Sequence, residues 1–199
     1  MGRPREITDQ EILTQARECF LEAGPTLSAA AIARKLGISE GTLFNRFSTK
    51  EQLMRRALGV PEPRWVELLV NDPPDLHAQL VRVARSLLSF FQEAMPAMNL
   101  LRAAGLRPDH PETETTEPPP KRLHRELTQW LEREQIKGRL ANRSPAVRAQ
   151  ALIGSLHAHA MMRHIWGKTM VELDDATYAH QLVDTLFHEL SESSEEHIE

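Results

Sequence analysis

The sequence predicts an all-α protein. Apolar residues recur with the period of an amphipathic helix from one end of the 199-residue chain to the other. The alternating β-branched pattern of a half-buried strand is almost absent, and capping residues and helix-ending Gly or Pro divide the chain into segments of helical length. An apolar content of 41% suffices for the core of one domain, or of a small domain joined to a larger one.

The first helix is expected to run from about Thr8 to Ala23. Thr8 and Glu11 have the spacing of a capping box, and Gly24 followed by proline ends the helix. Its apolar face consists of Ile12, Ala16, Cys19, Phe20 and Ala23. The single cysteine lies on this face, so we expect a buried thiol in a reducing compartment.

Two short helices joined by a tight turn follow. Ser28 is expected to cap the first, Gly37 to end it, and Ser39 to cap the second. Two helices joined by a three- to four-residue turn containing Gly form a helix-turn-helix, whose second helix enters the DNA major groove. An αα-corner used only for packing is the alternative.

The face that locks this motif together differs from the face left free. The inward residues are expected to be Ile32, Leu36, Ile38, Leu43 and Phe47, and the outward ones Thr42, Phe44, Asn45 and Arg46. A fourth helix is expected to open with a capping box at Ser48–Glu51 and to carry Leu53, Met54, Ala57 and Leu58 inward. Prolines end it at 61 and 63.

One set of spacings in this region is more specific than any single motif. It consists of Phe20, Gly24, Ile32-Ala33, Leu36-Gly37-Ile38-Ser39, Gly41-Thr42-Leu43-Phe44, Phe47 and Ser48-Thr49-Lys50-Glu51-Gln52-Leu53. With these residues, the run from Thr8 to Leu58 resembles the N-terminal DNA-binding domain of the TetR family of transcriptional regulators. Phe44 departs from the family's usual Tyr, and Ser28 from a common Thr.

The resemblance implies DNA-contacting residues by position. Phosphate contacts are expected from Ser28, Thr42, Asn45 and Lys50, together with backbone N–H groups at the start of the helix that Ser39 opens and of the helix that follows it. Base contacts are expected from Thr42, Leu43 and Phe44, with Arg46 beside them. Lys50 as a solvated surface charge and Leu43 as a core residue are the alternatives. Arg3 and Arg5 form either a basic arm that enters a minor groove or a disordered tail.

Charge is divided unevenly along the chain. Residues 1–56 hold nine basic and seven acidic side chains, a net charge of +2, so the remainder carries −6 of the total of −4. A basic end on an acidic chain permits nucleic-acid binding without proving it. We place the domain boundary between residues 1–60 and residues 61–199.

The larger part of the chain is predicted to be helical as well. A long helix begins near Asp75, and Pro96 is expected to kink or restart it. Residues 107–120 are expected to form an exposed or mobile connection, because they are rich in Pro, Thr and Glu. A helix over about 121–136 is expected to face inward with Leu123, Leu127, Trp130 and Leu131.

The last two helices are candidates for an interface. One opens at Ser144-Pro145, runs to about Trp166 and is apolar on most sides; the other is capped by Asp174 and carries a broad apolar stripe. Such helices pair with a second copy as a four-helix bundle, or complete the core of a monomer. We favour a homodimer through these two helices, since two half-sites multiply the selectivity of one short recognition helix for double-stranded DNA.

The family resemblance also implies an unknown small-molecule inducer bound in the larger domain. Candidate pocket residues are Phe90, Phe91, Met95, Met98, Trp130, His157, Met161 and Met162, because Met and aromatic side chains shape adaptable apolar cavities. For each of them a core position is the simpler interpretation. We expect a cytoplasmic repressor with no cofactor and no membrane partner, since the sequence has no signal peptide or membrane span.

Other classes of function are less favoured. His157 and His164 share a helix face, but a metal site or an enzyme there needs a further ligand that the sequence does not supply. No catalytic triad, phosphate-binding loop or cysteine cluster is present in the sequence. The main rival is a helical protein-interaction module with only non-specific DNA binding.

Overall fold

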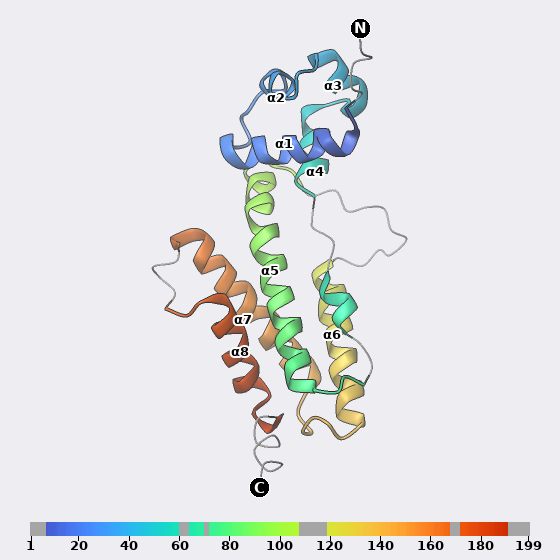
Figure 1. The fold of residues 1–199 in the computed structure, drawn as a ribbon, viewed down its shortest axis with the longest axis vertical. Coiled ribbons are helices and arrows are strands. Elements are labelled where there is room, and N and C mark those ends of the chain that lie inside the picture. The colour runs from blue at the N-terminus through green and yellow to red at the C-terminus, as the bar shows by residue number, and fades with distance from the viewer. Residues whose placement is uncertain (1–6, 60–63, 70–71, 108–118, 168–171, 191–199) are drawn as a thin grey trace. The chain divides into compact units, whose positions relative to one another are not determined.

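A computed structural model describes residues 7–59, 64–69, 72–107, 119–167 and 172–190. These residues form eight α-helices and one 3-10 helix, with no strand among them, so the all-α prediction is confirmed (Figure 1). The chain divides into two compact units, Met1–Pro61 with Ala94–Thr113 and Glu62–Glu93 with Glu114–Glu199. Residues 94–107 therefore group with the N-terminal unit, while the boundary predicted from the sequence separates residues 1–60 from residues 61–199.

Four short helices build the N-terminal unit: α1 (Asp9–Ala23), α2 (Ala29–Leu36), α3 (Glu40–Phe47) and α4 (Lys50–Ala57). The capping box at the start of α1 is confirmed: the Thr8 hydroxyl accepts a hydrogen bond from the Glu11 backbone, and the Glu11 carboxylate accepts one from the Thr8 backbone at 2.8 Å. Both side chains thereby satisfy backbone donors that an open helix end would leave unpaired.

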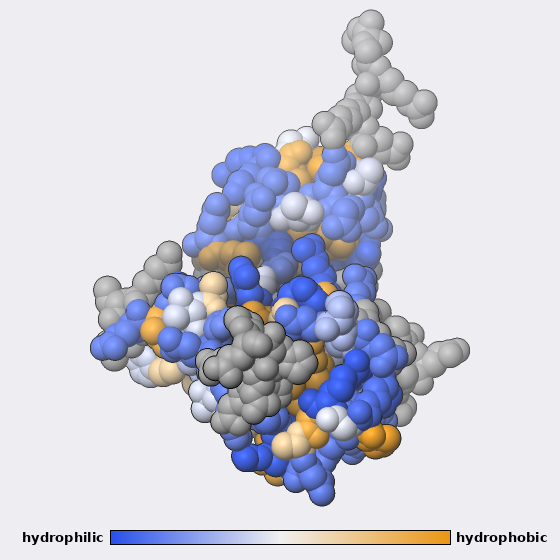
Figure 2. All heavy atoms as spheres, turned by 60° about the horizontal axis from the view of Figure 1, so that its bottom comes forward, coloured by the Kyte–Doolittle hydropathy of each residue, from blue (hydrophilic) through white to orange (hydrophobic). Residues whose placement is uncertain are grey.

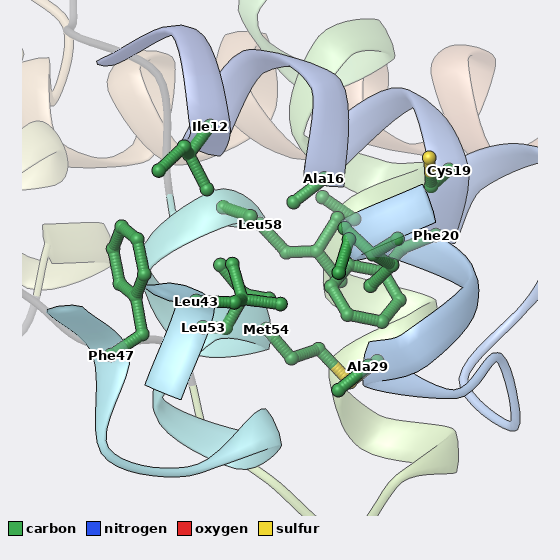
Figure 3. Close-up of a cluster of buried hydrophobic side chains, with 14 of the residues drawn as sticks. Ile12, Ala16, Cys19, Phe20, Ala29, Leu43, Phe47, Leu53, Met54 and Leu58 are labelled. Atoms are coloured by element: carbon green, nitrogen blue, oxygen red, sulfur yellow. The ribbon is translucent and has the colours of Figure 1, made fainter. Parts of the chain in front are cut away.

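The core of this unit combines side chains from all four helices (Figure 3). Its largest fully buried members are Phe20, Phe47, Ile12, Ile32, Leu43, Leu53, Met54 and Leu58. Full burial of each such side chain stabilises the fold by about 1.5–3 kcal/mol. Ala97 and Leu101 join the same cluster from the C-terminal part of α5 (Leu76–Ala103). Ala23 was predicted to face inward but is exposed.

The start of α4 differs from the prediction. The N-cap is Thr49, whose hydroxyl accepts a hydrogen bond from the Gln52 backbone at 3.0 Å. Ser48 precedes the cap with a φ of 33°, so the capping box predicted at Ser48–Glu51 is wrong by one residue.

The second unit is built from the N-terminal part of α5, the 3-10 helix η1 (Arg64–Leu68), α6 (Pro119–Ile136), α7 (Pro145–Trp166) and α8 (Asp175–Leu186). Within it, α6 packs against α7 and α7 against α8. The four inward residues predicted for α6 are buried, and the N-caps of α7 and α8 are the predicted serine and aspartate.

Pro96 lies inside α5 rather than between two helices. The helix continues past it to Ala103, so of the predicted kink or restart the restart is wrong, and the kink stays a prediction. Most of the connection predicted over 107–120 lies outside the described residues, and α6 begins at Pro119, two residues before the predicted start.

Polar residues cover most of the face shown in Figure 2, with separate apolar patches between them. Among the described residues, no helix combines the length and the apolar character that a membrane span requires.

Candidate nucleic-acid interface

The turn between α2 and α3 depends on one backbone conformation. Gly37 has φ 68° and ψ 26°, in the left-handed region that a side chain disfavours. The turn is closed by hydrogen bonds from the Gly37 backbone to the Arg34 carbonyl at 3.2 Å and from the Ile38 backbone to the Ala33 carbonyl at 3.1 Å. These bonds satisfy carbonyls at the end of α2 and fix the direction in which the chain enters α3.

Two buried residues orient α3 about its own axis. Leu43 and Phe47, one helical turn apart, are 1% and 0% exposed. Their burial leaves Asn45 exposed, while Thr42 and Phe44 are half-buried at the surface of the helix. Phe44 also packs against the core cluster.

One predicted base contact is corrected by this arrangement. Leu43 lies in the core of the unit and shows almost none of its surface to solvent, so its side chain has no access to a base edge. Leu43 is therefore a core residue, which was the alternative interpretation of this position from the sequence. Its role is to hold α3 in place.

The polar residues at the helix starts act as caps. The Ser39 hydroxyl accepts a hydrogen bond from the Thr42 backbone at 3.0 Å and lies 2.7 Å from the Thr42 hydroxyl. The Ser28 hydroxyl accepts one from the Ala31 backbone at 3.2 Å, which opens α2. Both serines are exposed, so the N-terminal ends of α2 and α3 are accessible to an anion.

Two basic residues that were predicted to contact DNA have partners within the unit. Arg46 donates to the Ile7 carbonyl and pairs with Asp9 at 3.2 Å, which ties α3 to the start of α1. Lys50 donates to the Pro25 carbonyl at 2.8 Å, which ties α4 to the loop before α2. Both are half-buried, so neither is a fully solvated charge.

These two links were not found from the sequence. Each joins residues far apart along the chain, and only the fold brings them together. Arg3 and Arg5 lie outside the described residues.

Three of the predicted ligand-binding residues contact one another in the structure. In the second unit, Phe91 makes edge contacts with Phe90 and His157, with ring centroids 5.7 and 5.3 Å apart. Trp130 is fully buried, and Met161 and Met162 are 39% and 38% exposed. The remaining two, Met95 and Met98, lie in the part of α5 that belongs to the N-terminal unit.

The buried histidine of α7 is His159, not His157. Its Nε2 lies 3.0 Å from Asp175, and its ring stacks on Tyr178 with centroids 4.0 Å apart. Helical spacing carries a usable signal, because His159 lies three and seven residues after the buried Leu156 and Leu152. His157, the histidine predicted from the sequence to line the ligand pocket, is exposed.

Asp175 is the centre of a polar cluster in this unit. Gln92 donates to it at 2.9 Å, and Arg163 pairs with it at 3.2 Å. Burial opposes ionisation of Asp175, but the hydrogen bonds from Gln92 and His159 and the charge of Arg163 outweigh it and hold the pKa of the carboxyl below its ordinary value. The cluster links α5, α7 and α8 through one carboxylate.

Comparison with known proteins adds a family match and several structural likenesses. Residues 12–57 match the family model described as bacterial regulatory proteins, tetR family. Similar solved structures include the regulator PfmR from Thermus thermophilus (20% identity, TM-score 0.59, covering 89% of this chain and 97% of that one).

Two further similar structures carry functional descriptions of their own. NalD, the secondary repressor of the MexAB-OprM multidrug efflux pump in Pseudomonas aeruginosa, has 24% identity and a TM-score of 0.54, covering 89% of this chain and 92% of its own. AibR, solved in complex with isovaleryl coenzyme A and operator DNA, has 19% identity and a TM-score of 0.57, covering 89% and 97%. At these identities the likenesses show the fold alone.

Proposed function

We propose that this chain, which carries the DNA-binding domain of the TetR family, is a transcriptional repressor that binds a palindromic operator as a dimer and is released by a small apolar or amphipathic molecule. The observation that carries the proposal is the orientation of α3 within the N-terminal unit. Its burial of Leu43 and Phe47 leaves Asn45 exposed and Thr42 and Phe44 partly exposed at the surface of the helix-turn-helix.

Within this proposal the outward side chains of α3 divide the recognition. Asn45 is exposed and carries both a donor and an acceptor, so it can contact a phosphate or a base edge. Thr42 supplies a hydroxyl and a methyl group, and Phe44 supplies an apolar edge that suits a thymine methyl. The N-terminal ends of α2 and α3, with Ser28 and Ser39, position the phosphate backbone.

The basic residues have a second role in the proposal. Arg46 already ties α3 to the start of α1 through the Ile7 carbonyl, and Lys50 ties α4 to the loop before α2 through the Pro25 carbonyl. Each has further N–H donors, so a phosphate can be bound while the existing bond is kept. Arg3 and Arg5 are proposed to reach the minor groove next to the major-groove helix.

Dimerisation is supported by the surface of α7. Val147, Ile165 and Trp166 are 66%, 55% and 56% exposed in the single chain. Exposed large apolar side chains at both ends of one helix favour burial against another surface. A second copy using α7 and α8 would cover them and bring two α3 helices to one operator.

Regulation by a small molecule is supported by analogy and by chemistry. AibR carries an acyl coenzyme A ligand together with its operator, and NalD represses an efflux pump. In this chain Phe91 contacts both Phe90 and His157, so one polar group lies beside two aromatic rings. We place the protein in the cytoplasm, where its DNA target would lie.

Selection of purified full-length protein against random DNA duplexes at near-physiological salt tests this function. An enriched palindrome is expected from the wild type. The Asn45→Ala variant should enrich an altered or weaker DNA motif. Asn99 on α5 is also exposed, and the Asn99→Ala variant should enrich the same motif as the wild type. If the folded dimer enriches no sequence, the proposal is wrong and the interaction-module alternative takes its place.

A further inference from the structure

Three potential metal ligands meet where the first turn of α5 packs against α8. His77 lies next to the first residue of α5, and His180 and Asp184 lie four residues apart on α8, which places them on one face. One ligand atom from each residue lies within 4.8 Å of the others. All three residues belong to the second unit.

The carboxylate of Asp184 is shared between the two imidazoles. His77 Nε2 lies 2.6 Å from one carboxylate oxygen, and His180 Nε2 lies 3.6 Å from the other. The two imidazole rings meet edge to face, with centroids 5.2 Å apart. Both histidines thus direct their Nε2 atoms toward the carboxylate of Asp184.

We propose that His77, His180 and Asp184 form a binding site for a divalent transition-metal ion of the Zn²⁺ class. Imidazole nitrogen and carboxylate oxygen are the ligands such ions use, and three protein ligands leave one position for water or a further group. Metal-to-ligand distances of about 2.0–2.1 Å in a tetrahedron place ligand atoms about 3.3 Å apart. The three ligand atoms lie within 4.8 Å of one another, so small side-chain rotations bring them to that spacing.

Side-chain rotation is enough to reach this geometry. The side chains of His180 and Asp184 are 56% and 38% exposed, so both can turn without disturbing the core, and the ion can enter from solvent. His77 is less exposed, at 21%, and acts as the fixed ligand. The ordinary alternative is an ion pair that only joins α5 to α8.

The site is separate from the pair His157 and His164 weighed from the sequence. That pair had no identified third ligand, whereas here three ligands from two helices converge. The proposed metal site does not depend on the proposed function in transcription.

Zinc titration of the untagged, chelator-treated full-length protein tests the proposal. The wild type is expected to bind one Zn²⁺ per chain at this site and to gain thermal stability on binding. His77→Gln, His180→Asn and Asp184→Asn should each weaken binding by more than about tenfold, since even outer-shell groups contribute 10- to 100-fold. His164→Asn, an exposed histidine on α7, should bind zinc like the wild type.

Cobalt provides a second readout. Co²⁺ bound by the wild type should show the visible absorption of a low-coordinate site, and His180→Asn should lose it. Because His180 is more than half exposed, that variant keeps its fold even if His77→Gln does not. Zinc affinity that is unchanged in His180→Asn and Asp184→Asn, or no saturable binding by the wild type, overturns the proposal.

Discussion

Replacing Gly37 with alanine should destabilise the N-terminal unit through backbone strain alone. Gly37 has φ 68°, and a Cβ added there would meet no atom within 4 Å. No steric clash therefore contributes to the expected effect. The left-handed conformation costs an L-residue about 1–2 kcal/mol, so we expect the free energy of unfolding to fall by about 1 kcal/mol once the stiffer unfolded chain is included.

The same substitution at Gly41 provides the matched control. Gly41 lies inside α3 with an ordinary helical φ, and an added Cβ would lie 3.8 Å from the Ser39 hydroxyl, an ordinary contact. Alanine in a helix is more stable than glycine by up to about 0.5–1 kcal/mol. Gly41→Ala should therefore be neutral or stabilising, while Gly37→Ala should be destabilising.

Urea unfolding followed by far-UV circular dichroism at one fixed protein concentration measures both changes. Amide hydrogen exchange in residues 29–47 then assigns the change to the helix-turn-helix. If Gly37→Ala is as stable as the wild type, or both variants shift the midpoint in the same direction, backbone conformation is not what makes glycine necessary at the turn.

Three further predictions concern the second unit. Arg148→Ala should lower the free energy of unfolding by about 2–3 kcal/mol, because it leaves Glu189, which is 18% exposed and lies 2.6 Å from Arg148, without its main charge partner. This is less than the roughly 3–5 kcal/mol expected for a fully buried pair, and a change under about 0.5 kcal/mol in urea unfolding would contradict it. The pKa of Asp175 is depressed in the fold, so its ionised form stabilises the fold above the unfolded pKa of about 3.9, and this contribution is lost as the pH falls through the lower folded pKa. Asp175→Asn should therefore be less stable than the wild type at pH 7, and the difference in the free energy of unfolding should close below about pH 4. A difference that is independent of pH would refute the assignment. Trp166→Lys should shift the sedimentation coefficient toward that of a monomer, and an unchanged dimer at the same concentration would exclude this part of α7 from the interface.

Local signals in the sequence predicted most of the helices. The cap at Thr8, the ends at Gly24 and Gly37, and the proline at position 145 each act through neighbouring backbone groups, so they can be recognised without the fold. The start of α4 shows the limit of such signals. Ser48–Glu51 and Thr49–Gln52 both fit the capping pattern, and only the structure shows that Thr49 is the cap.

Contacts between distant segments could not be predicted. Arg46 and Lys50 have the composition and position of DNA contacts, yet their hydrogen bonds to Ile7 and Pro25 depend on how α1, α3 and α4 pack. The convergence of His77 with α8 is equally invisible to periodicity, because it joins residues about a hundred positions apart. The burial of His159, in contrast, could be predicted from the spacing of buried residues within α7.

If α3 reads a DNA sequence, the protein should distinguish a selected duplex from a scrambled duplex of the same composition, and the ratio of the two affinities measures this. Fluorescence anisotropy at about 150 mM salt would give both dissociation constants. A sequence-reading dimer should bind the selected duplex at least about 10³-fold more tightly. A ratio near one, with both affinities falling steeply as salt rises, would mean that only phosphates are recognised, which contradicts the account.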